Sequence, residues 1–197
     1  MEQVLLTNID SSSVLAVCPI VQNLDWLLEH SNPQRRNYAM AMKSDRRRVE
    51  WLSWQMLLGQ VLGTDEFETS YRASGAPYII GDARHLSVSH CRDYVAVLVS
   101  DGACGLDIEL GSRDFSKASE RFAGEDVKDD LALVWSAKET VYKYLEDDEI
   151  AMLTDIVVDG IGESEIDSHV GEECYNLSYL RMDKLNVVYL LKNKQSH

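Results

Sequence analysis

The chain of 197 residues is long enough for one large domain or two small ones, and its 45% hydrophobic and 26% charged residues are typical of a globular protein. Its net charge of −14 argues against general binding to nucleic acid, and no apolar run is long enough to cross a bilayer. No basic stretch precedes the apolar residues 14–21, so we expect no signal peptide.

In the first half, hydrophobic periodicity and turn residues predict two helices and several strands. A helix is expected at 24–29, and a longer one at 45–62. Ser44 or Asp45 can cap the longer helix, and Gly63 ends it. The expected strands are separated by short turns and lie at 14–20, 78–80, 85–90 and 94–99.

In the second half, a strand with an Asp-x-Glu pattern follows a turn at 100–103. The other expected elements are helices at 114–122 and 130–145 and strands at 156–158, 175–180 and 187–191. Strands and helices therefore occur in both halves, which predicts an α+β fold. Because no low-complexity linker separates them, residues 1–100 and 101–197 should pack closely as one unit.

The charge is unevenly distributed. Residues 1–100 hold 9 Lys/Arg and 11 Asp/Glu, a net charge of −2, whereas residues 101–197 hold 10 and 22, a net charge of −12. One basic cluster, which is either a solvated helix face or a binding surface for an anion, contains Arg35, Arg36, Lys43, Arg46, Arg47 and Arg48. The cysteines, which we interpret as reduced thiols of a cytoplasmic protein, are Cys18, Cys91, Cys104 and Cys174.

Three acidic residues are the most informative feature. Asp107 and Glu109 alternate with Leu106 and Ile108, so they should project from one face of a strand, with α-carbons roughly 6.5 Å apart. Glu139, on the following helix, would complete an oxygen-rich site that suits Mg²⁺. The simpler interpretation is that the two strand acids face solvent at a strand edge.

Basic and polar side chains accompany the acids. Lys138 and Lys143 flank Glu139, and Glu139 and Lys143 are four residues apart on one helix face. They form either an exposed ion pair or a metal ligand beside a phosphate-binding lysine. His90, which ends the segment Ser-Val-Ser-His, is either a surface histidine or a phosphate contact.

Four segments, taken in order, resemble the motifs of the 4′-phosphopantetheinyl transferase family. They are Ser-Gly-Ala-Pro-Tyr at 74–78, Ser-Val-Ser-His at 87–90, Gly-Leu-Asp-Ile-Glu at 105–109 and Trp-Ser-Ala-Lys-Glu-x-x-x-Lys at 135–143. The resemblance is to the longer, single-chain type that activates synthetases and carrier proteins. It covers about residues 44–145, and the four motifs together are specific.

The resemblance implies two similar α+β halves related by pseudo-two-fold symmetry, with coenzyme A bound between them in a monomer. It implies Mg²⁺-dependent transfer of the phosphopantetheine arm from coenzyme A to a serine of an apo acyl or peptidyl carrier protein. Adenosine 3′,5′-bisphosphate would be released.

The resemblance also assigns the metal and the catalytic groups. Asp107, Glu109 and Glu139 would bind Mg²⁺. Glu139 would help to deprotonate the serine, directly or through a metal-bound water, and Lys143 would act with it. Mg²⁺ as a Lewis acid and lysine as an electrostatic catalyst are what attack on a diphosphate requires.

Coenzyme A would be bound by further residues. Lys138 and Lys143 would lie along the pyrophosphate, and Ser89 and His90 would contact the phosphates. Arg48 is a further expected contact with coenzyme A, because the basic cluster that contains it should lie near the nucleotide end of the cleft or at the carrier-binding face.

The sequence departs from the family at three places. Ala76 stands where the family often has a basic residue, and Arg72 could take the place of that residue. Gln55 stands where the family has a helix arginine, and the basic run ending in Arg48 could compensate for its loss. The segment between Phe122 and Trp135, which helps to receive the carrier protein in the family, is short. Two alternatives remain open, a non-catalytic coenzyme A-binding module and a metal-dependent phosphohydrolase.

Overall fold

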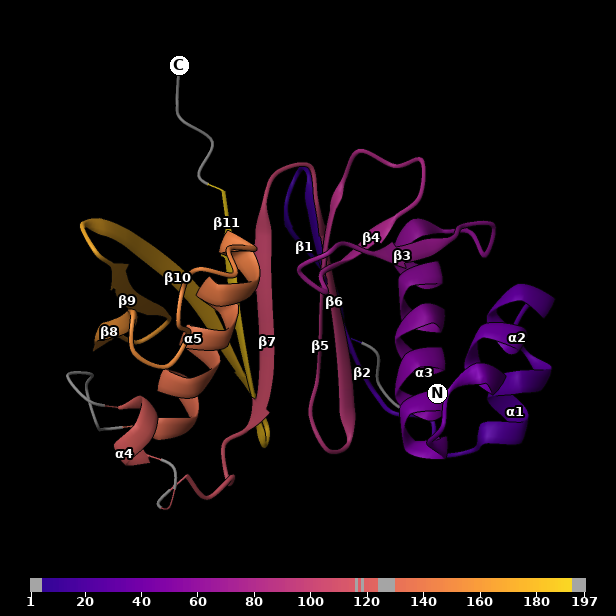
Figure 1. The fold of residues 1–197 in the computed structure, drawn as a ribbon, viewed down its shortest axis with the longest axis horizontal. Coiled ribbons are helices and arrows are strands. Elements are labelled where there is room, and N and C mark those ends of the chain that lie inside the picture. Colours follow the sequence, from indigo (N-terminus) through magenta and orange to yellow (C-terminus); the bar gives the residue numbers. More distant parts are fainter. Residues whose placement is uncertain (1–4, 116, 118, 124–129, 193–197) are drawn as a thin grey trace.

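The computed structural model describes residues 5–115, 117, 119–123 and 130–192. Over these residues, two main antiparallel sheets and their helices stack in four layers, in the order helix, sheet, sheet, helix (Figure 1). The mixture of strands and helices confirms the predicted α+β class. None of the described helices is both long enough and apolar enough to cross a membrane.

The first main sheet has the strand order β1-β2-β6-β5. Its strands are β1 (Leu5–Asp10), β2 (Ser13–Pro19), β5 (His85–His90) and β6 (Tyr94–Ser100). Strand β6 is buried on both faces, because Val95 and Val97 pack toward the helices and Ala96 and Leu98 pack toward the second sheet. The sequence of β6 is therefore a continuous apolar run without the alternation of a half-exposed strand.

Helix α3 (Asp45–Leu62) covers the outer face of this sheet, and α1 (Leu24–Glu29) and α2 (Pro33–Ala41) pack against α3 (Figure 1). The side chain of Asn23 caps α1 and that of Asn32 caps α2. Helix α3 ends at Gly63, whose φ of 68° is left-handed, as predicted. Helix α2 was not predicted, because it buries only Arg35 and Ala39 and lacks an apolar stripe.

The second main sheet has the strand order β7-β11-β10-β9-β8, and helix α5 (Leu131–Leu145) covers its outer face. Its strands are β7 (Cys104–Leu110), β8 (Ile156–Ile161), β9 (Glu165–Val170), β10 (Glu173–Met182) and β11 (Leu185–Leu191). Strand β9, strand β1 of the first sheet and the short strand β3 (Thr69–Tyr71) were missed. The helix expected at 114–122 is only the short α4 (Ser119–Phe122), and positions 116 and 118 lie outside the described residues.

The two sheets share a hydrophobic core. Leu15 and Leu98 of the first sheet pack with Leu106, Ile108 and Val187 of the second. Strands β5 and β7 lie side by side where the sheets meet, and a short ribbon of β3 (Thr69–Tyr71) and β4 (Pro77–Ile79) lies next to β5 (Figure 1). We call this junction of β5 and β7 the seam.

All four cysteines belong to the described part of the chain, and all are free thiols. Cys104 is buried near the seam, and burial raises the pKa of its thiol to about 12. Burial likewise raises the pKa of Cys18 to about 11. These two thiols are therefore protonated and unreactive near neutral pH.

Candidate functional site

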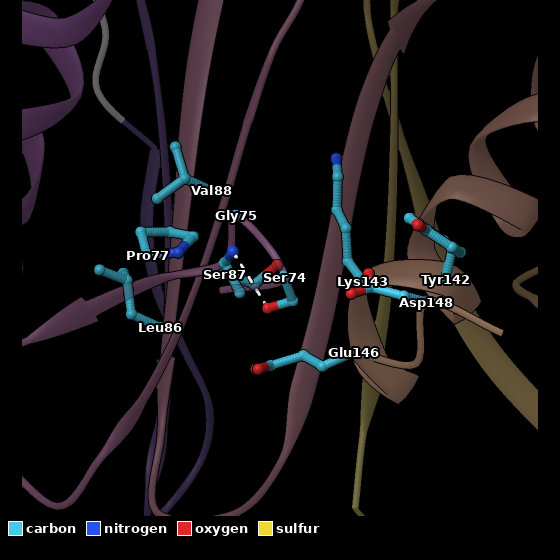
Figure 2. A pocket seen from close by; sticks show the side chains of 11 residues that line it. Ser74, Gly75, Pro77, Leu86, Ser87, Val88, Tyr142, Lys143, Glu146 and Asp148 are labelled. Carbon is cyan, nitrogen blue, oxygen red and sulfur yellow. Dashed lines mark hydrogen bonds between the residues drawn. The ribbon is translucent and has the colours of Figure 1, made fainter. Parts of the chain in front are cut away.

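A cavity of about 180 Å³ opens at the seam, between the turn before β4 and the C-terminal end of α5 (Figure 2). Its lining residues are Ser74, Gly75, Ala76, Pro77, Leu86, Ser87, Val88, Tyr142, Lys143, Glu146 and Asp148. Glu146 has a left-handed φ of 50° and pairs with Arg72, with 3.3 Å between Oε2 and Nε. The walls therefore combine apolar surface with one lysine and two acids.

Strand β7 directs alternate residues into two environments. Leu106 and Ile108 belong to the core between the sheets, so Gly105, Asp107 and Glu109 face helix α5. The two acids are not at a solvent-facing strand edge, since Asp107 is only 5% exposed and Glu109 only 6%. The simpler interpretation of the Asp-x-Glu pattern is therefore wrong.

A glycine in β7 sets how closely the helix approaches. A Cβ atom at Gly105 would collide with the backbone carbonyl oxygen of Thr140 and would press on Tyr144. Only glycine allows α5 to lie this close to the strand. Because Glu139 and Lys143 lie four residues apart on one face of α5, the close approach of the helix brings them near the acids of β7.

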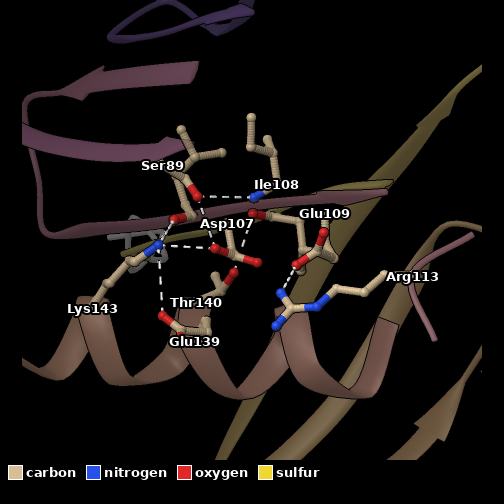
Figure 3. Close-up of polar contacts among 10 residues, drawn as sticks. Ser89, Asp107, Ile108, Glu109, Arg113, Glu139, Thr140 and Lys143 are labelled. Carbon is tan, nitrogen blue, oxygen red and sulfur yellow. Dashed lines mark hydrogen bonds and ion pairs between the residues drawn. The ribbon is translucent and has the colours of Figure 1, made fainter. Parts of the chain in front are cut away.

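Asp107 is held by a lysine and a serine from different elements (Figure 3). Lys143 Nζ lies 2.9 Å from Asp107 Oδ1 and 3.0 Å from the carbonyl oxygen of Leu106. Ser89 Oγ donates to the same Asp107 oxygen at 2.8 Å and accepts from the backbone N–H of Ile108 at 3.1 Å. Ser89 therefore joins strand β5 to strand β7 at the acidic site.

Glu109 is paired with an arginine that follows the strand. Arg113 donates from Nη1 to Glu109 Oε2, and the backbone N–H of Leu110 donates to Oε1 at 2.9 Å (Figure 3). The guanidinium lies 4.6 Å from the ring centroid of Phe115 and 5.5 Å from that of Trp135. Aromatic rings thus hold the arginine beside the acid.

Glu139 completes the group. Its Oε2 lies 3.8 Å from Lys143 Nζ. Burial is the largest influence and raises the pKa of Glu139 above its ordinary value; Lys143 lowers it, and the carboxylates of Asp107 and Glu109 raise it. The structure therefore brings the three acids that the sequence singled out into one electrostatic environment, beside Lys143.

These residues fit a hydrated Mg²⁺ ion. Carboxylate oxygens are its preferred protein ligands, and it usually keeps several waters. Within the described residues, Asn186 Nδ2, directly across from Glu109 on β11, and Ser136 Oγ, one turn before Thr140 on α5, are buried without a hydrogen-bond partner. A bound water is one partner that satisfies such groups. No three His, Cys, Asp or Glu side chains in the described ranges converge as metal ligands, and Lys143 and Arg113 pair with Asp107 and Glu109.

Lys138 lies away from the predicted diphosphate position. It is 1% exposed, and its ammonium donates to the carbonyl oxygens of Leu153, at 3.3 Å, and Ile156. Neighbouring helix residues point about 100° apart, so Lys138 faces the core where Glu139 faces the acids. This placement corrects the expectation that Lys138 contacts coenzyme A.

The other two predicted phosphate contacts, Ser89 and His90, diverge. Successive residues of a strand point to opposite faces, and only Ser89 reaches the acids. His90 is exposed at the end of β5. It does not line the cavity.

The basic cluster is used mainly within its own half. Arg48 donates to the carbonyl oxygen of Met42 at 2.6 Å and to Asp45 at 2.6 Å, and it does not line the cavity. Arg35 donates to the carbonyl oxygen of Asp65 at 3.0 Å. Arg46 pairs with Glu50, and Arg36 with the end of α1. Asp45 and a helix end therefore engage the guanidinium of Arg48, and its contact with the nucleotide stays a prediction.

No protein-family model matches the chain, and no curated protein sequence matches it significantly. The site is therefore described by its own geometry.

Three residues of the site were not anticipated from the sequence. Arg113 follows Glu109 by four positions in a loop, where such spacing has no fixed meaning. Asn186 reaches the site through the register of β11 against β7, and that pairing is not visible in the sequence. Ser136 had a usable signal, since it precedes Glu139 by three positions on a predicted helix.

Proposed function

We propose that this protein is a Mg²⁺-dependent 4′-phosphopantetheinyl transferase. It would transfer the phosphopantetheine arm of coenzyme A to a serine of an apo acyl or peptidyl carrier protein and release adenosine 3′,5′-bisphosphate. One observation carries the proposal: the four motif segments, which are far apart in the sequence, meet at the seam. The turn at 74–77 and Ser87 line the cavity, Ser89 binds Asp107, and Lys143 reaches both.

The arrangement of the halves supports the same proposal. In residues 1–100 an antiparallel sheet carries a long helix, α3, on its outer face, and in residues 101–197 a second antiparallel sheet carries α5. The inner faces share a core, so both halves of one chain form the cleft. We propose that the halves are related by pseudo-two-fold symmetry and that the protein acts as a monomer.

The acids and the lysine would divide the work. Asp107, Glu109 and Glu139 would hold Mg²⁺, which when bound supplies Lewis-acid stabilisation of the diphosphate. Lys143, fixed by Asp107 and a backbone carbonyl, presents a positive charge at the cavity wall. That charge would stabilise the negative charge that grows on the diphosphate oxygens.

Glu139 is the candidate general base. The serine oxygen forms a bond to the β-phosphorus, the bond from phosphorus to the adenosine bisphosphate oxygen breaks, and the hydroxyl proton leaves. A carboxylate whose pKa is raised by burial is a better proton acceptor than an exposed one. Glu139 is the acid of the three that lies on the helix bordering the cavity.

The test is a transfer assay. Purified protein is incubated with coenzyme A, MgCl₂ and a panel of apo acyl and peptidyl carrier proteins, and the mass of each carrier is measured. A carrier that gains the mass of phosphopantetheine, only with Mg²⁺ and not with Asp107→Asn, supports the proposal. Coenzyme A binding without modification of any carrier would instead identify a binding module, and coenzyme A cleavage without modification would identify a phosphohydrolase.

A further inference from the structure

Both oxygens of Glu109 are already engaged. The backbone N–H of Leu110 holds one, and Arg113 holds the other. Since the Glu109 side chain is only 9% exposed, little water can replace a lost partner. A divalent cation that binds Glu109 must therefore compete with the guanidinium of Arg113.

The turn after β7 and two aromatic rings hold Arg113 beside Glu109. It follows β7 in a turn in which its backbone N–H donates to the carbonyl oxygen of Leu110 at 2.9 Å. Phe115 and Trp135 pack against each other, with ring centroids 5.6 Å apart, and both lie beneath the guanidinium. Trp135 belongs to α5, so the arginine bridges the strand acids and the helix that carries Glu139.

The two cationic side chains of the site, Lys143 and Arg113, differ in how tightly the protein holds them. Lys143 is bound by Asp107, Glu139 and the carbonyl oxygen of Leu106, and its side chain is 26% exposed. Arg113 lies on a loop, and its side chain is 49% exposed. Arg113 is the cation that can leave with less loss of structure.

Building on the proposed function, we infer that the guanidinium of Arg113 has two placements. Without a divalent cation it neutralises Glu109. When Mg²⁺ takes the acids, Arg113 leaves Glu109 and binds the diphosphate of coenzyme A. The three carboxylates and the two cationic side chains of the site together carry a net charge of −1. A bound divalent ion changes this net charge to +1, which favours binding of an anionic diphosphate.

Removal of the Arg113 charge should have opposite effects on the affinities for Mg²⁺ and for coenzyme A. In Arg113→Gln, Mg²⁺ without coenzyme A should bind roughly tenfold more tightly, because it no longer displaces a paired cation. In the same variant at saturating Mg²⁺, coenzyme A should bind roughly tenfold more weakly, because one charge-assisted contact is lost. A purely structural role would weaken both affinities or neither.

Isothermal titration calorimetry with MgCl₂ and then with coenzyme A measures both constants. Arg84→Gln is the matched control, since Arg84 is 40% exposed and pairs with Asp82 at 2.6 Å away from the acids; it should leave both constants unchanged. Arg113→Lys keeps the charge without the planar fork, so it should restore part of the coenzyme A affinity.

Tryptophan fluorescence gives a reading that needs no catalysis. Release of the guanidinium from Trp135 should change the emission of the wild-type protein during a MgCl₂ titration. The change should disappear in Arg113→Gln and in Trp135→Phe.

Mg²⁺ affinity that is unchanged or weaker in Arg113→Gln would overturn the inference, as would unchanged coenzyme A affinity. The proposed reaction fails separately: carriers that stay unmodified while Arg113→Gln tightens Mg²⁺ refute transfer but keep the two placements of Arg113. If Arg113→Gln does not fold, Arg113→Met decides, because it also removes the charge and keeps an apolar stem beside Phe115; tighter Mg²⁺ binding is expected, and unchanged binding would contradict the inference.

Discussion

Helices α3 and α5 cover equivalent faces of the two sheets, yet they use their buried polar residues differently. On α3, Gln55 donates to Thr69 at 2.7 Å, Ser53 accepts from the backbone N–H of Val21 at 3.3 Å, and Glu50 pairs with Arg46 at 2.8 Å. Each of these groups has a local partner and is satisfied. Their contribution is to stability.

On α5, the polar residues facing β7 are not all satisfied in this way. Glu139 shares its surroundings with two other carboxylates, and Ser136 Oγ, although buried, has no partner among the described residues. Like charges gathered out of solvent lower stability unless a ligand or counter-ion compensates. The proposed function accounts for this difference, with a ligand bound beside α5 and none beside α3.

The largest expected effect separates the two helices by activity. Asp107→Ala beneath α5 should lower kcat/KM for carrier modification by about a thousandfold or more, ~4 kcal/mol, as removal of an electrostatic catalyst does. Ser53→Ala on α3 should change kcat/KM less than about twofold and cost ~1 kcal/mol of unfolding free energy. Carrier mass spectrometry over time and urea denaturation measure these quantities. Near-normal turnover in Asp107→Ala would remove the acids from the mechanism.

A second test compares two lysines of α5 itself. Lys143→Met should lower kcat/KM by roughly a hundredfold, because the charge at the cavity wall is lost. Lys138→Met should instead cost ~2 kcal/mol of unfolding free energy, since the carbonyls of Leu153 and Ile156 lose their donor. Its turnover per folded molecule should stay within about threefold of wild type. The reverse pattern would return Lys138 to the site.

The sequence predicted which of these side chains lie together where the pattern was local, within one strand or one helix. The alternation around Asp107 and the four-residue spacing of Glu139 and Lys143 placed all three correctly. Lys138 was misplaced because it was judged by adjacency to Glu139, although a helix turns neighbours apart. The contact of Arg48 with the carbonyl oxygen of Met42 was not foreseen, because it depends on how α2 ends beside α3.

The fold shows the same division. Long helices with a clear end, such as 45–62 and 130–145, were predicted almost to the residue. Strands β1, β3 and β9 were missed because each is short and rich in polar residues, and pairing with a neighbouring strand is what makes it a strand. Contacts between distant strands, such as Asn186 beside Glu109, follow from register, which no short window of sequence carries.

The close approach of α5 to β7 offers a test through stability. Gly105→Ala should lower the unfolding free energy by ~2 kcal/mol, because its Cβ must push the backbone of α5 away. The matched control is Gly160→Ala on β8, where no atom lies within 4 Å of the added Cβ; it should change the unfolding free energy by less than ~1 kcal/mol. Equal effects in urea denaturation would show that α5 is not held at this distance.

The smallest effect concerns the buried amide of Asn186, which is 3% exposed. If Nδ2 has no partner without a ligand, Asn186→Leu removes an unsatisfied group and should leave the unfolding free energy unchanged or raise it by up to ~1 kcal/mol. The thermal stabilisation that MgCl₂ gives to the wild-type protein should then shrink in the variant, because a water beside Glu109 loses the amide as a hydrogen-bond donor. Thermal melts with and without MgCl₂ separate these effects. A destabilised apo variant with full Mg²⁺ stabilisation would show that the amide belongs to the support of the sheet, as the polar groups of α3 do.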